Sequence, residues 1–266
     1  MTTEERSPFT EHLSELRDRL IRSAIAVGIG FCSAYFFKEK LFEILTAPLI
    51  KAIGDDKNTQ MIFTGLPEAF FTYLKVSLIT GIVLATPILF YEFWMFISPG
   101  LYRDEKKYFL PIVLLSIIFF VLGSSFGYFI AFPYGFQFFL EFSTDSIHAM
   151  LSMKEYLSFS STLLLAFGFI FELPLVLSFM ARMGLVSVSF LQKNRKYAIL
   201  IIFIVAAVLT PGPDVISQLL MAGPLMVLYE IGIIGARIFG KKSNSETDED
   251  PESTMTPGDA DKSEES

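Results

Sequence analysis

The sequence predicts an all-α integral membrane protein with six transmembrane helices, both termini in the cytoplasm, an amphipathic amino-terminal helix and extracytoplasmic loops that cap the bundle. Three observations favour this fold class. Hydrophobic residues make up 52% of the 266 positions and charged residues only 18%, whereas about 25% charged is usual for soluble domains. Apolar runs long enough to cross about 30 Å of hydrocarbon recur along the chain. Basic residues gather in alternate connections between these runs.

Charge divides the chain into a membrane domain, residues 1–242, and an acidic tail, residues 243–266. The tail holds nine acidic residues against Lys262, so the rest of the chain carries about +1 of the formal net charge of -7. The tail is also rich in Ser, Thr and Pro and has no aromatic residue. Such a segment cannot bury enough apolar surface to offset its ordering entropy, and we expect it to be disordered and cytoplasmic.

The composition argues against an enzyme. One cysteine excludes a disulfide framework, and two widely separated histidines make a histidine-built metal site improbable. The stretch Gly235–Lys242 fits seven positions of a phosphate-binding loop, but the eighth is Lys and no strand precedes it. We therefore expect no cofactor, no metal and no nucleic-acid partner.

Six apolar runs predict the transmembrane helices. Their approximate limits are Leu20–Phe37, Tyr73–Ile97, Tyr108–Pro133, Tyr156–Ala181, Tyr197–Thr210 and Val215–Ala236. At 1.5 Å per residue the fifth run spans only about 21 Å, less than the usual hydrocarbon thickness. Our hypothesis is that the bilayer thins, or water enters, beside the fifth and sixth helices.

Lys and Arg counts set the predicted orientation. Fifteen of the 21 basic residues fall at the two termini and in the second and fourth connections, which places these segments in the cytoplasm. The first loop, Lys38–Thr72, and the third, Tyr134–Glu155, then lie outside. Their apolar content predicts that they pack against the bundle as caps.

The amino-terminal stretch predicts an amphipathic surface helix. Ser7 and Pro8 form a helix-start signal, and Leu13, Leu16 and Leu20 recur at intervals of three and four. Within this stretch, one interpretation of Glu15 is an exposed ion pair with Arg19, four residues later. A functional role for this cytoplasmic carboxylate is the alternative.

The second loop contains a turn, Ser98-Pro99-Gly100, followed by charged residues. Glu105 could be an ordinary carboxylate at the start of the third helix. Its position on the same predicted face as Glu15, among basic residues, raises a functional alternative.

Glu172 lies deep in the fourth apolar run, where inserting an ionisable group costs about 2.5–3.5 kcal/mol or more. We therefore expect it to face a polar cavity, to be paired or to be protonated. A structural hydrogen bond to a neighbouring helix is the simpler interpretation. Pro174, two residues on, predicts a kink. Glu68, Asp214 and Gln218 are further polar residues at membrane depth, and Asp214 after Pro213 is typical of a helix cap.

Taken together and in order, these segments resemble the TatC family, the multispanning subunit of the twin-arginine protein translocase. The matching stretches run from about residue 8 to residue 240 and are His12–Leu20, Ala47–Leu49, Pro67–Phe70, Ser98–Glu105, Phe167–Pro174 and Leu209–Gln218. Many relatives have Pro-Pro-Asp where this chain has Pro-Gly-Pro-Asp.

The resemblance implies a receptor for the twin-arginine signal peptides of folded proteins. It implies export driven by the proton-motive force, with single-span TatA-type and TatB-type subunits, self-association in a receptor complex, and a prokaryotic plasma membrane. By the same resemblance, Glu15 and Glu105 are the signal-binding carboxylates. The residues implied to accompany them are His12, Leu16, Arg17, Leu20, Leu101 and Tyr102. Glu172, Pro174, Asp214 and Gln218 are implied to act within the membrane, and Pro48, Pro67 and Glu68 to be structural.

Two other functions fit the composition. A proton-coupled small-solute transporter could use Glu172 as its protonation site, and would need several polar groups near it, for which Ser160, Ser161 and Gln218 are the candidates. A membrane scaffold organised by the amino-terminal helix would need neither Glu15 nor Glu105.

Overall fold

The fold is described from a computed structural model of the chain. It describes residues 8–53, 60–62, 65, 67–97, 109–140, 150–210 and 215–240. The predicted acidic tail lies outside these residues.

The described chain is almost entirely helical, because lipid offers no partners for backbone N–H and C=O groups and a helix satisfies them internally. The elements in order are α1 (Pro8–Phe36), α2 (Lys38–Ile53), β1 (Gln60–Ile62), α3 (Glu68–Ile97), α4 (Phe109–Phe126), the π-helix η3 (Gly127–Ala131), α5 (Phe132–Leu140), β2 (Met150–Ser152), α6 (Met153–Ile170), α7 (Leu173–Arg182), α8 (Val188–Lys193), α9 (Arg195–Leu209) and α10 (Val215–Phe239).

Within the described ranges, five helices are long and apolar enough to cross a membrane. The helix α9 has only 15 residues, as the short fifth run predicted. The amphipathic amino-terminal helix and the first span form one continuous helix, α1. The third span continues through η3 into α5, so the first residues of the predicted third loop are helical instead.

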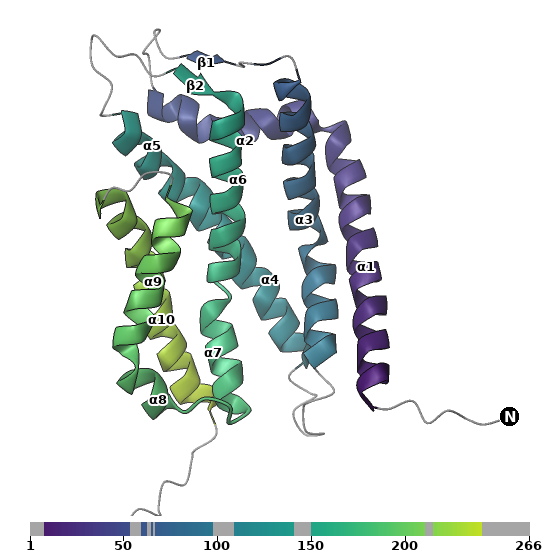
Figure 1. The fold of residues 1–266 in the computed structure, drawn as a ribbon, viewed down its shortest axis with the longest axis vertical. Helices are drawn as coiled ribbons and strands as arrows, with labels where there is room; N and C mark the ends of the chain where they lie inside the picture. The colour runs from purple at the N-terminus through teal and green to yellow at the C-terminus, as the bar shows by residue number, and fades with distance from the viewer. Residues whose placement is uncertain are drawn as a thin grey trace, which may run out of the picture.

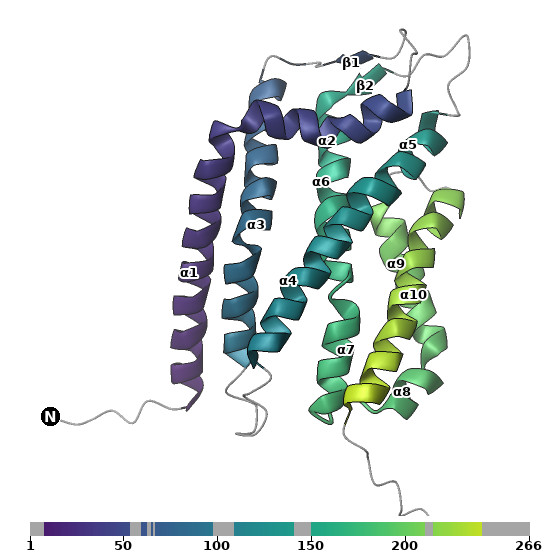
Figure 2. The same cartoon turned by 180° about the vertical axis from the view of Figure 1, so that it is seen from behind.

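The helices form an elongated bundle with two distinct ends (Figure 1). The start of α1, the end of α3, the start of α4 and the end of α10 lie at one end. At the other end α2 lies across the bundle, beside β1 and β2. In the reverse view, α4 crosses obliquely between the α1–α3 pair and the group formed by α7, α9 and α10 (Figure 2).

The far end of the bundle is a cap built from α2 and the strands, whose regular structure the apolar content of the loops did not predict. The strands β1 and β2 pair in parallel, with Gln60 opposite Met150. The hydroxyls of Tyr128 and Tyr156 each donate a hydrogen bond of 2.7 Å to a carbonyl of α2, at Ile44 and Leu45. The predicted packing of the first loop against the bundle is thus confirmed, and Pro48 lies buried inside α2.

Glu68 links the two chain segments that meet in this cap, the segment before α3 and the start of α6. Its buried carboxylate accepts hydrogen bonds from the Gly65 N–H at 3.2 Å, the Lys154 N–H at 2.9 Å and the Ser152 hydroxyl at 3.1 Å. Pro67 precedes it at the start of α3. One charged acceptor therefore holds the segment before α3 against the start of α6.

The fourth span breaks where Pro174 predicted a kink. Pro174 has no N–H to donate to the carbonyl of Ile170, and α6 ends at Ile170. The helix α7 begins at Leu173, and Glu172 lies in the turn between the two helices. The kink therefore places the Glu172 carboxylate at an irregular point of the backbone.

The helix α1 approaches α3 very closely at one point. A Cβ atom at Gly30 would lie 2.5 Å from the carbonyl oxygen of Gly81, so the two backbones touch. In the most apolar 18-residue stretch of α1, only 17% of the residues are buried. The pair of glycines therefore sets how close α1 can come to the rest of the protein.

We predict that Gly30→Ala lowers the free energy of unfolding by about 1–3 kcal/mol, because the added methyl group collides with rigid backbone. The matched control is Gly28→Ala on the same helix, where a Cβ meets nothing within 4 Å. That variant is expected to be neutral or slightly stabilising, since Ala favours helix more than Gly. Thermal unfolding in detergent checks both, and equal midpoints for the two variants would contradict the close approach.

Candidate functional site

A cluster of charged side chains lies where the amino-terminal part of α1 meets the last turns of α3. His12 stacks on Phe96, with ring centroids 4.4 Å apart and planes inclined by 16°. This contact fixes the first described turns of α1 against the end of α3. The predicted residues His12 and Glu15 both belong to this cluster.

Glu15 is paired with Arg19, as the simpler interpretation of the sequence expected. Arg19 Nε and Nη2 both donate to Glu15 Oε1, at 3.0 and 2.5 Å. The other oxygen, Oε2, faces His12 Nδ1 at 3.8 Å. Because 32% of the Glu15 side chain is exposed, a ligand can approach this carboxylate.

The pair is not an isolated surface contact, because Arg19 also reaches α3. Its third nitrogen, Nη1, donates to Glu92 Oε2 at 3.0 Å, and only 15% of the Arg19 side chain is exposed. Glu92 is more deeply buried, with 8% of its side chain exposed, and its other oxygen lies 3.6 Å from Arg22 Nη1. One guanidinium is thus shared between two carboxylates on different helices.

Glu92 was not among the residues that the sequence singled out. The signal that could have found it is the one that identified Glu172, a carboxylate inside an apolar run that spans a membrane. Glu92 lies within the predicted second span, Tyr73–Ile97. Its partner is 73 positions away in the sequence, so helix periodicity could not identify the pair.

The other predicted residues of the amino-terminal motif are on the surface of α1. Arg17 pairs with its neighbour Asp18, through hydrogen bonds of 2.9 and 2.8 Å. Leu13, Leu16 and Leu20 are 48%, 42% and 68% exposed. They give α1 an apolar face beside the charged cluster.

Leu101, Tyr102 and Glu105 lie outside the described residues. The segment that contains them follows Ile97, next to Phe96, and precedes Phe109 at the start of α4. Both of these flanking positions are at the same end of the bundle as the start of α1 (Figure 1).

The second predicted polar group, around Glu172, is small and buried. Glu172 is 7% exposed, and the hydroxyl of Ser116 on α4 faces its carboxyl group. The Trp94 Nε1 atom donates to the same hydroxyl at 2.8 Å. Glu172 Oε1 has no hydrogen-bond partner among the described residues. The neighbouring helix α4 that we considered therefore reaches Glu172 through Ser116, which accepts from Trp94, and the sequence suggested neither residue.

The structure does not gather the other candidates around Glu172. Ser160 and Ser161 lie at least eleven residues earlier on the same span, about three helical turns away. The Gln218 side chain instead donates to the Phe203 carbonyl at 2.9 Å and links α10 to α9. Asp214 lies outside the described residues. Within the described ranges, no three His, Cys, Asp or Glu side chains come together in a metal-ligating group.

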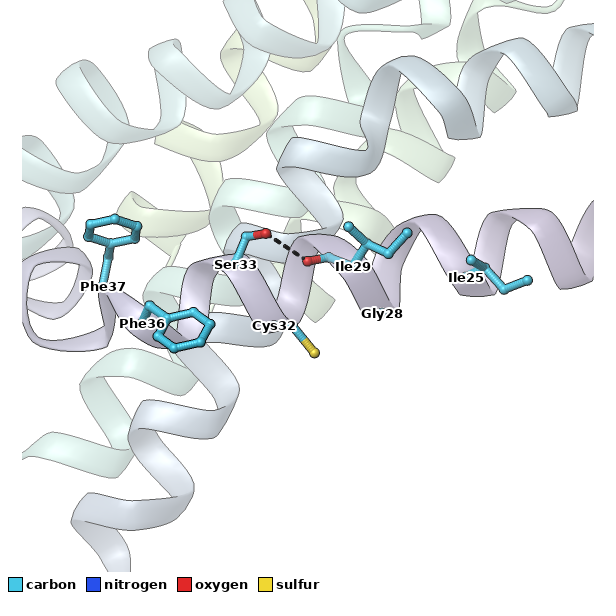
Figure 3. Close-up of a pocket in the computed structure, with 7 residues that line it drawn as sticks. All are labelled: Ile25, Gly28, Ile29, Cys32, Ser33, Phe36 and Phe37. Atoms are coloured by element: carbon cyan, nitrogen blue, oxygen red, sulfur yellow. Dashed lines mark hydrogen bonds between the residues drawn. The ribbon is translucent and has the colours of Figure 1, made fainter.

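The outward face of α1 carries a shallow apolar hollow (Figure 3). Figure 3 shows side chains from one helix and its end, Ile25, Gly28, Ile29, Cys32, Ser33, Phe36 and Phe37, with the Ser33 hydroxyl donating to the Ile29 carbonyl at 3.0 Å. The hollow has almost no polar lining, and its hydroxyl is already satisfied within the helix. It is suited to contact with lipid or an apolar chain.

Comparison with known proteins gives a consistent result. A family model described as Sec-independent protein translocase protein (TatC) matches residues 11–224. A curated relative of that name from Desulforapulum autotrophicum is 72% identical over 251 residues, which is 94% of this chain and 92% of the relative. The TatC protein of Escherichia coli strain K12 is 36% identical over 247 residues, covering 92% of this chain and 95% of the relative.

A solved structure has the same fold. The crystal structure of a twin-arginine translocase receptor, TatC, superposes with a TM-score of 0.76 at 41% sequence identity, covering 86% of this chain and 99% of the crystallised one. The recognised motifs, the multispanning helical fold and these matches agree. The chain is therefore a multi-pass membrane protein that belongs to the TatC family of Sec-independent protein translocase proteins.

Proposed function

We propose that this chain is the translocase subunit that binds the twin-arginine signal peptides of folded precursor proteins. The observation that carries the proposal is the Glu15 carboxylate, which is held by Arg19 through Oε1, faces His12 through Oε2 and keeps 32% of its side chain exposed. It lies at the end of the bundle that also holds the start and end of the described chain (Figure 1). A ligand could reach this carboxylate without entering the apolar part of the bundle.

The chemistry of the signal matches this site. A guanidinium is a planar fork that binds carboxylates through charge-assisted hydrogen bonds, about twice as strong as neutral ones. Two consecutive arginines need two such acceptors. We propose Glu15 as one and Glu105, on the segment that leaves α3 beside Phe96, as the other.

The surroundings of Glu15 suit the rest of a signal peptide. Leu16 and Leu20 form an exposed apolar face beside it, which can pack against the peptide's own apolar residues. We propose that His12 and Arg17 border the binding site on α1, and that Leu101 and Tyr102 border it on the connecting segment.

We propose a different role for the intramembrane residues. Glu172 and Pro174 at the kink, with Asp214 and Gln218 near the junction of α9 and α10, would contact single-span TatA-type and TatB-type subunits or a deeply inserted signal. Support comes from Glu172 Oε1, which is buried without a partner in the described part of the chain. A hydrogen-bond donor on a partner subunit or on the signal would therefore satisfy Glu172 Oε1.

The remaining parts of the proposal follow from the family and the charge pattern. We propose that the chain is a non-enzymatic component, that export is driven by the proton-motive force, and that the subunit self-associates within a receptor complex. The basic residues at both termini favour a cytoplasmic position for these segments in a prokaryotic plasma membrane.

A proton-coupled solute transporter finds no support here. That function needs several polar groups around Glu172, and in the described residues only Ser116, with Trp94 behind it, is placed there. The comparisons likewise name translocase proteins and no solute transporter.

We predict that a signal peptide with Lys-Lys in place of Arg-Arg binds about tenfold less tightly, because an ammonium carries the charge but not the planar fork. Photocrosslinking from positions 12–20 and 101–106 to a tagged precursor measures this difference. In the same assay Glu15→Gln and Glu105→Gln each lower Arg-Arg crosslinking. Equal crosslinking of the two peptides would refute the assignment of these carboxylates.

We predict that Glu172→Ala leaves surface binding of the signal nearly unchanged but disturbs partner contact or deep insertion of the signal. In the described residues no hydrogen bond or ion pair joins Glu172 to Glu15, Arg19 or Glu92, and the substitution removes the carboxyl group beside Ser116. Crosslinking at residues 12–20 and copurification of the single-span subunits separate the two effects. Loss of surface binding in this variant would show that Glu172 is structural.

A further inference from the structure

Glu92, the carboxylate that the sequence did not reveal, belongs to the charged cluster where α1 meets the last turns of α3. It does not contact solvent freely, and it reaches Glu15 only through the guanidinium of Arg19. Three groups, Glu15, Arg19 and Glu92, are therefore joined by hydrogen bonds of 3.0 Å or less.

The net charge of these three groups, the Glu15–Arg19–Glu92 triad, decides whether the site attracts a cationic ligand. Two carboxylates share one guanidinium, so Glu15, Arg19 and Glu92 together carry a net charge of -1. Arg22 also pairs with Glu92, at 3.6 Å, but its side chain is 64% exposed. Water and salt screen the exposed charge of Arg22 far more than they screen the buried Arg19–Glu92 pair.

Without Glu92 the charge on Glu15 would be cancelled. Arg19 would then have a single carboxylate partner, and an incoming cation would meet a neutral pair. With Glu92 present, Arg19 is held by α3, and one unit of negative charge is left for a ligand.

We propose that Glu92 is a positioning residue of the signal-peptide site, which keeps Glu15 able to bind cationic cargo by sharing the Arg19 guanidinium. Glu92 touches no cargo itself. This inference rests on the proposed function, since it assumes that Glu15 receives a cargo arginine.

The geometry also explains how cargo could bind without leaving a buried charge unpaired. Full bidentate binding of Glu15 by a cargo guanidinium needs both carboxylate oxygens, so Arg19 has to release Oε1. Arg19 can do so at low cost because its Nη1 atom already pairs with Glu92. Removing one partner of a buried ion pair is otherwise strongly destabilising.

The test measures the affinity of a fluorescent Arg-Arg signal peptide, and of its Lys-Lys counterpart, for the full-length protein in lipid nanodiscs. Glu92→Gln keeps the shape of the side chain but removes its charge, and we expect Arg-Arg affinity to fall about threefold to tenfold. Glu92→Asp keeps the charge but changes the shape, and is expected to stay within about twofold of the unmodified protein. A purely structural role predicts the opposite order.

A second variant tests whether Glu92 acts through Arg19. Adding Arg19→Gln to Glu92→Gln returns the triad to a net charge of -1, and we expect affinity to recover to within about twofold of the unmodified protein. The matched control is Glu230→Gln, which removes one carboxylate from the Arg195–Glu230 pair of 2.7 Å on α9 and α10 and should leave peptide affinity unchanged. Thermal unfolding of every variant in the same nanodiscs identifies any loss of fold.

The outcomes separate this inference from the proposed function. An unchanged affinity in Glu92→Gln, or a double variant as weak as Glu92→Gln alone, would overturn the role of Glu92. If either Gln variant fails to fold, Glu92→Asp decides alone, because a loss of affinity in a folded protein that keeps the charge contradicts the proposal. An unchanged affinity in Glu15→Gln would instead overturn the assignment of Glu15 as the receptor carboxylate.

Discussion

The cost of leaving a polar group inside the bundle without a partner shapes this structure. Lipid cannot hydrogen-bond, so each polar side chain at depth is either paired or costly. Glu92 is paired with Arg19, the Trp94 indole with Ser116, and Gln218 with a backbone carbonyl of α9. These contacts join different helices, so the rule that satisfies the polar groups also determines which helices lie together.

The same rule divides the bundle into regions of different character. The α1–α3 pair meets through a glycine contact and one charged cluster, and leaves most of α1 uncovered. The other helices enclose a larger apolar core in which Phe132, Leu157 and Ala206 are almost fully buried. A well-packed core beside a helix with few buried residues leaves an accessible surface where α1 meets the end of α3, without weakening the rest of the bundle.

Much of the fold followed from hydrophobic run lengths and a few residues. The six runs, the short α9 and the break before Pro174 depend on local properties, namely length, hydropathy and a missing N–H. The cap at the far end did not follow, because α2 and the two short strands are held by contacts between segments far apart in the chain, such as Glu68 with Ser152 and Lys154. The candidate site divides in the same way. The pairing of Glu15 with Arg19, four residues later, was evident from helix spacing. The pairing of Arg19 with Glu92 was not, because it depends on how α1 is placed against α3.

The lightly covered helix also offers a practical opportunity. Cys32 is the only cysteine in the chain, and it is exposed on the outward side of α1 (Figure 3). A thiol-reactive fluorophore or spin label would therefore attach at one known position without any prior mutagenesis. Its emission or relaxation would distinguish lipid from a docked polypeptide along that side of the molecule, in a subunit whose sequence is otherwise unaltered.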